Sequence, residues 1–220
     1  MDYISLNRAG IIRFRQIVNE NHLHLGCWVC KLNTHSIIKC ADDINKEKLI
    51  DIVNELVKLR KRNGRLILLG IGGSLANCSH AVNDFRKLCN IRAITPADNI
   101  SEFSARVNDD GWNSYFVNWM KVSDINKNDV IFVLSVGGGN KQKKISMNIV
   151  EAIKFAKSKK ILIMGIVGKK DGETFKKGDH IILVNSANKK LITPIVESYQ
   201  SIILHSIVFH PKLQVNKSKW

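Results

Sequence analysis

The chain has 220 residues, 45% of them hydrophobic, and a formal net charge of +15. This length suits one domain with a sizeable core. No apolar run of membrane-spanning length and no signal-peptide pattern is evident, so we predict a cytoplasmic protein with no membrane partner. The basic residues are scattered and accompany no helix-turn-helix, zinc-finger or RNA-recognition motif, which argues against a nucleic-acid partner.

Two helices are predicted before the first strand. Apolar residues at helical spacing cover about 6–22 and again 47–62, and Gly64 follows the second helix at the expected C-cap position. Between them, Cys27 and Cys30 have C-x-x-C spacing without a second pair, which favours two buried thiols over a redox or zinc site.

From residue 65 onward, predicted strands and helices alternate. The predicted strands are 65–69, 91–94, 130–134, 161–166 and 180–184, and the predicted helices are 74–87, segments up to about 120, 145–159 and 193–209. The strands are continuously apolar, which is typical of a parallel sheet buried on both faces. The sequence therefore predicts an α/β fold, a flavodoxin- or Rossmann-like parallel sheet with helices on both faces, ending in a loosely held segment from Gln214.

The first predicted strand leads into the run Gly70-Ile71-Gly72-Gly73-Ser74 and then a helix. Glycines let a backbone approach an anion closely, and the free amides and dipole of a helix N-terminus favour negative charge. Ser74 could cap the helix and donate to a phosphate oxygen. The spacing matches neither the P-loop nor the dinucleotide pattern, so a purely structural turn is the alternative.

A second glycine turn, Ser135-Val136-Gly137-Gly138-Gly139-Asn140, follows the strand at 130–134. Lysines between residues 141 and 144 come next, and a helix opens near Ser146. In an open α/β sheet, ligands bind at the carboxyl ends of the strands. The two turns therefore predict a phosphate site at that edge, although the lysines could equally be a solvated surface loop.

These residues together resemble the SIS (sugar isomerase) domain family and, within it, the phosphoheptose isomerases. The resemblance covers nearly the whole chain and is carried by the motifs 70–74 with His80 and Asp84, 108–111, 135–140, 168–172, and a last helix with Glu197, Gln200 and His205. There are departures: the family typically has Ser-Thr-Ser-Gly-Asn-Ser at the second turn, glutamate at the position of Asp84 and glutamine at that of Glu197.

The resemblance implies a single SIS domain over 1–220, with N-terminal helices at 1–63, a sheet core at 64–210 and a tail at 211–220. It implies a homotetrameric isomerase that converts D-sedoheptulose 7-phosphate to D-glycero-D-manno-heptose 7-phosphate for heptose and lipopolysaccharide synthesis. Two alternatives stay open: an isomerase of another sugar phosphate, and a non-catalytic protein that binds sugar phosphates.

Four side chains could carry the chemistry. His80 and Asp84 lie four residues apart, and Glu197 and His205 lie eight apart, so each pair shares a helix face. Two such helices could bring together two imidazoles and two carboxylates, a set able to bind zinc or to act as acid and base. The resemblance implies that Asp84 and His205 are catalytic, and that all four residues are candidate zinc ligands. His80 and Asp84 could instead be structural or surface residues, and Glu197 a first-turn acid.

The predicted substrate and phosphate contacts lie on both turns, in the polar stretch after the strand at 91–94, and at the start of the helix predicted at 145–159. They are Gly72, Gly73, Ser74, Asn99, Ser135, Gly137, Gly138, Gly139, Asn140 and Ser146. Asn99 is included because the resemblance places it where the family has an aspartate that contacts sugar hydroxyls.

Overall fold

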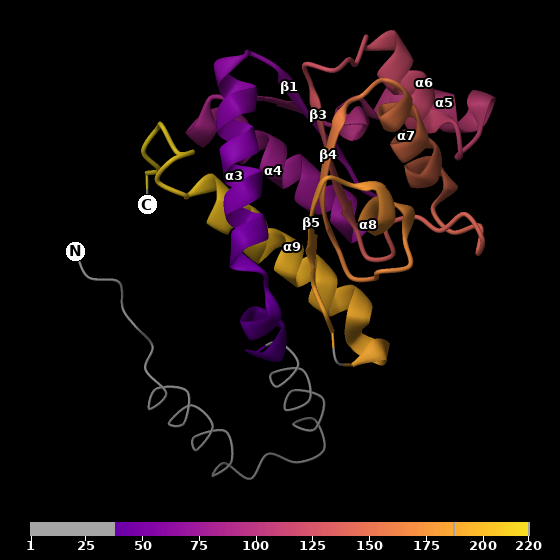
Figure 1. Ribbon diagram of the computed structural model, residues 1–220. Helices are drawn as coiled ribbons and strands as arrows, with labels where there is room; N and C mark the ends of the chain where they lie inside the picture. The colour runs from indigo at the N-terminus through magenta and orange to yellow at the C-terminus, as the bar shows by residue number, and fades with distance from the viewer. Residues whose placement is uncertain (1–37, 187, 220) are drawn as a thin grey trace.

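The computed structural model describes residues 38–186 and 188–219 (Figure 1). The predicted helix at 6–22 and the Cys27 and Cys30 pair lie outside the described residues. The described part contains a five-stranded parallel sheet in the order β2-β1-β3-β4-β5. The strands are β1 (Arg65–Leu69), β2 (Arg92–Ile94), β3 (Val130–Ser135), β4 (Leu162–Val167) and β5 (His180–Leu183). This is the flavodoxin-like order, so the predicted fold class is confirmed.

The helices lie close to their predicted positions. They are α3 (Lys46–Lys61), α4 (Gly73–Cys89), α5 (Ile100–Asp110), α6 (Tyr115–Val122), α7 (Met147–Ser158), α8 (Glu173–Lys177) and α9 (Ile192–Val208), with short 3₁₀ turns η1 (Pro96–Asp98) and η2 (Lys189–Leu191). Helix α8 was not predicted, because one and a half turns are too short to show a helical period.

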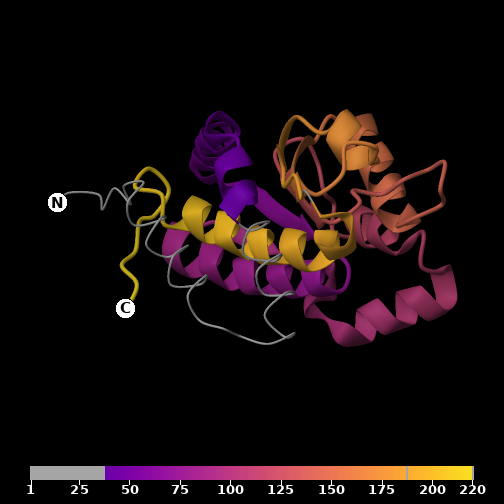
Figure 2. The ribbon, with the colours of Figure 1, turned by 90° about the horizontal axis from the view of Figure 1, so that it is seen from below.

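Helices cover both faces of the sheet, as the apolar strands predicted. On β1, Leu66 and Leu68 pack into the cluster formed with α3, α4 and α9, whereas Ile67 and Leu69 pack against α6 and α7. Successive strand residues point to opposite faces, so one short strand serves both cores. Figure 2 shows α4 and α9 lying side by side beneath the sheet, and this pair of helices positions the candidate site.

Helix α9 with its preceding turn, Lys189–Val208, is long and apolar enough to cross a membrane by length and composition alone. The prediction that no apolar segment is long enough to span a membrane was therefore wrong for this segment. Yet 44% of this segment is buried inside the protein, and residues such as Val196, Ile203 and Ile207 are fully or almost fully buried. Its apolar character is explained by packing against α4 and the sheet.

An ion pair joins β1 and β3 at the edge opposite the glycine turns. Arg65 Nη2 lies 2.7 Å from Asp129 Oδ2, and the Arg65 backbone N–H donates to Asp129 Oδ1 at 2.9 Å. Burial of Asp129, which is 3% exposed, would by itself raise its pKa. Hydrogen bonds from the Arg65 side chain and from the backbone of Asn126 and Arg65 outweigh that effect and lower the pKa of Asp129 below its ordinary value.

The segment after α9 is tied down, so the prediction of a loose end from Gln214 was wrong for its first residues. Leu213 is fully buried, and the backbone N–H groups of Val215 and Asn216 both donate to the carbonyl of Leu88, at 2.9 and 3.0 Å. The last carbonyls of a helix have no partner within the helix. The end of α4 therefore offers an acceptor that holds this segment.

Candidate active site between two parallel helices

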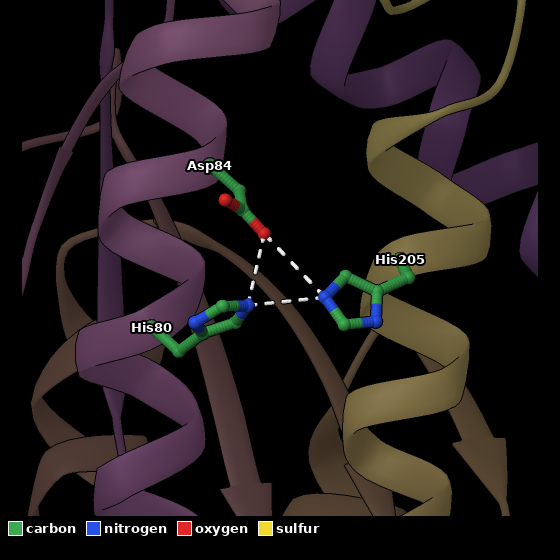
Figure 3. Close-up of side chains that lie close together, drawn as sticks. All are labelled: His80, Asp84 and His205. Carbon is green, nitrogen blue, oxygen red and sulfur yellow. Dashed lines mark hydrogen bonds and ion pairs between the residues drawn. The ribbon is translucent and has the colours of Figure 1, made fainter. Parts of the chain in front are cut away.

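Helices α4 and α9 bring three chemically active side chains together (Figure 3). His80 and Asp84 lie one turn apart on α4, and His205 faces them from α9. The two histidine Nε2 atoms are 3.0 Å apart, while Asp84 Oδ2 lies 3.2 Å from His80 Nε2 and 3.6 Å from His205 Nε2. Three of the four predicted catalytic or metal-binding side chains thus converge on one point.

The group is open to solvent on one side. The side chains of His80 and His205 are 54% and 45% exposed, whereas that of Asp84 is 14% exposed. At 3.0 Å between two Nε2 atoms, one ring must donate a proton and the other accept it. The arrangement therefore supplies a carboxylate and a proton-bearing imidazole to a molecule that approaches from solvent.

The spacing of the three atoms also suits a metal ion. Tetrahedral zinc with bonds of 2.0–2.1 Å places its ligand atoms about 3.3 Å apart, close to the 3.0, 3.2 and 3.6 Å observed. Two imidazole nitrogens and one carboxylate oxygen form a donor set that zinc accepts. Three protein ligands leave a fourth position for water or substrate, as in catalytic rather than structural zinc sites.

Glu197, predicted as a fourth ligand, does not join this group. Its carboxylate packs on Gly73, where an added Cβ would lie 2.4 Å from Glu197 Oε2 and 2.9 Å from Oε1. Glu197 and His205 are eight positions apart, which corresponds to a rise of about 12 Å along α9. The sequence correctly indicated a shared helix face, but residues two turns apart lie at different heights on that face.

The first glycine turn opens α4 differently from the prediction. Gly72, with φ +60°, is the N-cap residue and makes no side-chain capping bond. Ser74 is already inside the helix and is 2% exposed, so the prediction that it caps the helix was wrong. The backbone of Gly72 still accepts from the N–H groups of Leu75 and Ala76. Only the N–H groups of Gly73 and Ser74, at the very start of the helix, are left for the anion that the phosphate prediction assumed.

A polar contact that the sequence did not reveal links the second turn of α4 to α9. Asn77 Nδ2 donates to the backbone carbonyl of Glu197 at 2.8 Å and to Gln200 Oε1 at 3.2 Å. Gln200 is fully buried, and its Nε2 has no hydrogen-bond partner within the described part of the chain. Gln200 could have been selected from the sequence, because it is a polar residue in a very apolar helix. Nothing in the sequence around Asn77 indicated that it makes this contact.

The second glycine turn is braced by α8. Ser135 Oγ accepts from the N–H of Gly138 at 3.0 Å, and Thr174 donates to the Gly138 carbonyl through both its N–H and its hydroxyl. Gly138 and Gly139 adopt φ values of +70° and +71°, which favour glycine. Ser135, predicted to contact phosphate, thus accepts a hydrogen bond that shapes the turn.

Asn140 and Asp171 hold the lysine-rich end of this turn. The Asn140 amide donates to Asp171 and accepts from the N–H of Lys143, while Lys143 Nζ lies 2.6 Å from Asp171 Oδ2. The hydrogen bond from Lys143 lowers the pKa of Asp171 below its ordinary value. Asn140 is 8% exposed, and its side chain is engaged in the turn itself. Ser146 is the N-cap residue of α7, with φ +49° and no side-chain capping bond.

Asn99 is placed in a structural role. Its Oδ1 accepts from the N–H groups of Ser101 and Glu102, at 3.1 and 3.2 Å, and so caps α5. Asparagine is among the strongest N-cap residues. The structure therefore supports a cap at Asn99, whereas the predicted contact with sugar hydroxyls has no support in its geometry.

Both glycine turns lie at the carboxyl edge of the sheet, and α4 begins at the first of them. The chain leaves β1 to form β2 on one side and then crosses to β3 on the other, so β1 and β3 flank the point where the strand order reverses. The phosphoheptose isomerase of Cytophaga hutchinsonii is 30% identical to the chain over 142 residues, which cover 62% of the chain and 69% of that protein. The chain belongs to the phosphoheptose isomerase family.

Other comparisons agree with this membership. Phosphoheptose isomerase 2 of Campylobacter jejuni is 27% identical over 181 residues, covering 78% of the chain and 85% of that relative. The solved phosphoheptose isomerase of Neisseria gonorrhoeae has the same fold, with a TM-score of 0.70 at 20% identity, covering 84% of the chain and 97% of that structure. No family model matches the chain. The SIS-type fold of the family is thus present in a divergent sequence.

Proposed function

We propose that the protein is an aldose–ketose isomerase that interconverts D-sedoheptulose 7-phosphate and D-glycero-D-manno-heptose 7-phosphate. The observation that carries this proposal is the convergence of His80, Asp84 and His205 in a chain of the phosphoheptose isomerase family. Its relatives from Campylobacter and Cytophaga are named for this reaction. The product would feed heptose synthesis for lipopolysaccharide in the cytoplasm.

The reaction moves one proton between two carbons and another between two oxygens. Asp84 removes a proton from C1 of the ketose, while His205 gives a proton to the carbonyl oxygen at C2, which forms an enediol. Asp84 then returns its proton to C2, and the hydroxyl proton at C1 passes back to His205, which leaves the aldehyde. The imidazole of His80, 3.0 Å from that of His205, accepts or returns the shared proton.

Zinc is a proposed cofactor of the same three side chains. His80, Asp84 and His205 would hold the ion, and when bound it would polarise the carbonyl of the substrate. If zinc is used, chelation of the metal should lower turnover, and added zinc should restore it. Turnover that is unchanged after complete chelation would contradict this part of the proposal.

The substrate phosphate is expected at the glycine turns, where backbone amides can surround it. The exposed lysines at 141, 144 and 169 add positive charge beside the second turn. Beside His205, the exposed side chains of Ile202 (51%) and Phe209 (46%) leave an apolar strip on α9. We propose that a second copy covers this strip, in agreement with the homotetramer implied by the resemblance.

The first test is incubation of metal-defined protein with sedoheptulose 7-phosphate in D₂O, followed by NMR and mass spectrometry. Appearance of the aldose, with deuterium bound to carbon, would support proton transfer through a protein base. A second candidate is isomerisation of another sugar phosphate, favoured by the shorter Asp84 and the altered second turn. Pentose and hexose phosphates in parallel assays distinguish the two, since the preferred substrate shows the highest kcat/KM.

A further inference from the structure

Helices α4 and α9 lie side by side and run in the same direction (Figure 2). A shift of α9 along its own axis would therefore move His205 relative to both of its partners on α4. The reacting atoms of the three side chains lie within 3.6 Å of one another. A misplacement of 1 Å can cost about a hundredfold in rate, and apolar packing is not directional. The group thus depends on a directional contact that fixes the axial position of α9.

Asn77, on the second turn of α4, makes such a contact. Its Nδ2 donates to the backbone carbonyl of Glu197 at 2.8 Å and to Oε1 of Gln200 at 3.2 Å. An amide nitrogen carries two protons, so one side chain can make both bonds. The carbonyl of Glu197 belongs to the helix backbone and cannot rotate away as a side chain could. The contact therefore fixes a point on α9 that lies about 12 Å before His205 along the helix axis.

Gln200 takes part in this contact at a cost in stability. It is fully buried in an apolar helix, and its Nε2 has no hydrogen-bond partner within the described part of the chain. A buried N–H group without an acceptor costs about 1–3 kcal/mol. Leucine would fill a similar volume without this cost, so packing alone does not account for a glutamine here. Residues that break a local rule in this way are expected where function requires them.

We propose that Asn77 and Gln200 are positioning residues, which hold α9 at the axial position that the candidate active site requires. His205 then lies within reach of His80 and Asp84 (Figure 3). This inference rests on the proposed function for the reaction that the three side chains perform, but not for the geometry that the contact maintains. A contact that only strengthened the docking of α9 would, when removed, lower stability and leave activity intact.

The first test separates stability from geometry. Gln200→Leu removes the unpaired Nε2, so the Tm should be unchanged or higher, while kcat falls about tenfold with little change in KM. Asn77→Leu removes both bonds to α9 and should lower kcat about a hundredfold, with the fold checked by circular dichroism. The matched control is Cys89→Ala, which removes the 3.5 Å bond from Sγ to the Val208 carbonyl at the other end of the same helix pair. It should lower the Tm and keep the wild-type kcat.

Zinc affinity gives a second readout that needs no turnover. Two imidazoles and a carboxylate form a zinc donor set only where they converge, so titration of metal-free protein with zinc reports their geometry. Asn77→Leu should weaken zinc binding about tenfold. In the His205→Ala background, where the group is already broken, Asn77→Leu should have no further effect on zinc affinity or rate.

Two outcomes would overturn the inference. One is a wild-type kcat and zinc affinity in Asn77→Leu, and the other is an equal loss from this substitution with and without His205. A wild type that binds zinc through the three side chains but does not isomerise the heptose phosphate would contradict the proposed function alone, because the zinc titrations would still test the positioning role.

Discussion

The two glycine turns of this protein are alike in sequence and different in surroundings. Each follows a buried strand, β1 or β3, and each leads toward a helix at the same edge of the sheet. The first turn faces α9, which contributes the Glu197 carboxylate. The second turn is braced by Thr174 of α8 and bordered by lysines. A glycine-rich turn therefore predicts close approach of the backbone, while segments distant in sequence decide what can approach it.

The largest expected effect separates chemistry on the α4–α9 side from the phosphate binding proposed at the glycine turns. His205→Ala should lower kcat about a thousandfold, the usual contribution of a general acid–base residue, and leave phosphate affinity unchanged. The exposed position of His205 makes the fold tolerant of this change. Rates by NMR and phosphate affinity by calorimetry measure the two effects. Ser206→Ala, on the same helix, is the control and should keep full activity. Loss of phosphate affinity in His205→Ala would mean that the two functions are not separate.

The next effect concerns the ion pair that joins the two strands bearing the turns. Asp129→Asn leaves the Arg65 guanidinium without its carboxylate and should lower the free energy of unfolding by about 3 kcal/mol at neutral pH. Because the pKa of Asp129 is lowered in the folded protein, this stabilisation is present above about pH 4. It is lost as the pH falls through the lowered value.

Denaturant unfolding at pH 7, 5 and 3 should therefore show the two proteins converging in acid. Glu151→Gln, which removes an exposed pair with Lys154 at 3.9 Å, should change stability by less than about 0.5 kcal/mol at each pH. A difference between Asp129→Asn and wild type that stayed constant down to pH 3 would show that the charge of Asp129 is not what stabilises this edge.

A steric comparison of the turns gives a smaller effect. A Cβ on Gly172 would lie 2.1 Å from the backbone carbonyl of Gly137, so Gly172→Ala must displace the second turn and should cost about 2 kcal/mol of stability. Gly73→Ala should cost less, because the Glu197 carboxylate that it meets is the end of a rotatable side chain. Thermal melting ranks the two variants. The reverse ranking would indicate that the first turn is the more rigid one.

The smallest effect tests whether the lysines beside the second glycine turn attract the substrate phosphate. Lys141→Met with Lys144→Met should raise KM for the sugar phosphate about fivefold, with kcat unchanged, because the loss affects ground state and transition state alike. The difference should shrink at high salt, since exposed charges are screened. Steady-state kinetics at two salt concentrations measure this effect. Lys154→Met is the control and should match the wild type.

Much of the fold could be predicted from the sequence because its strands are continuously apolar and its turns carry glycine. The alternation of short apolar runs with segments of helical period predicted every described strand. Five such runs separated by helices are compatible with few folds other than a parallel sheet. Helix α8 was missed because its period is too short. The held segment after Gln214 was missed because its partner, the carbonyl of Leu88, is a backbone group 127 or more residues away in the chain.

The candidate site could be predicted only in part. The spacing of His80 and Asp84 and the family resemblance indicated the residues that meet His205. Helical spacing predicts which face of a helix a side chain lies on, but not which partner lies beside it along the helix axis. Glu197 was therefore wrongly predicted to join His80, Asp84 and His205. The roles of Ser74 and Asn99 depended on where helices begin, which sequence patterns fix only to within a few residues. The contact made by Asn77 could not be predicted because its partners, Glu197 and Gln200, lie on α9, more than 100 residues away in the chain.

The parallel pairing of α4 with α9 has a consequence for how activity arises during synthesis. His80 and Asp84 leave the ribosome early, whereas His205 belongs to a helix that follows all five strands. Domains form as their chain emerges, at about 5–20 residues per second. The catalytic group is therefore incomplete until the end of synthesis. The enzyme becomes competent only when α9 docks, because this helix supplies His205 together with apolar residues that cover α4 and one face of the sheet.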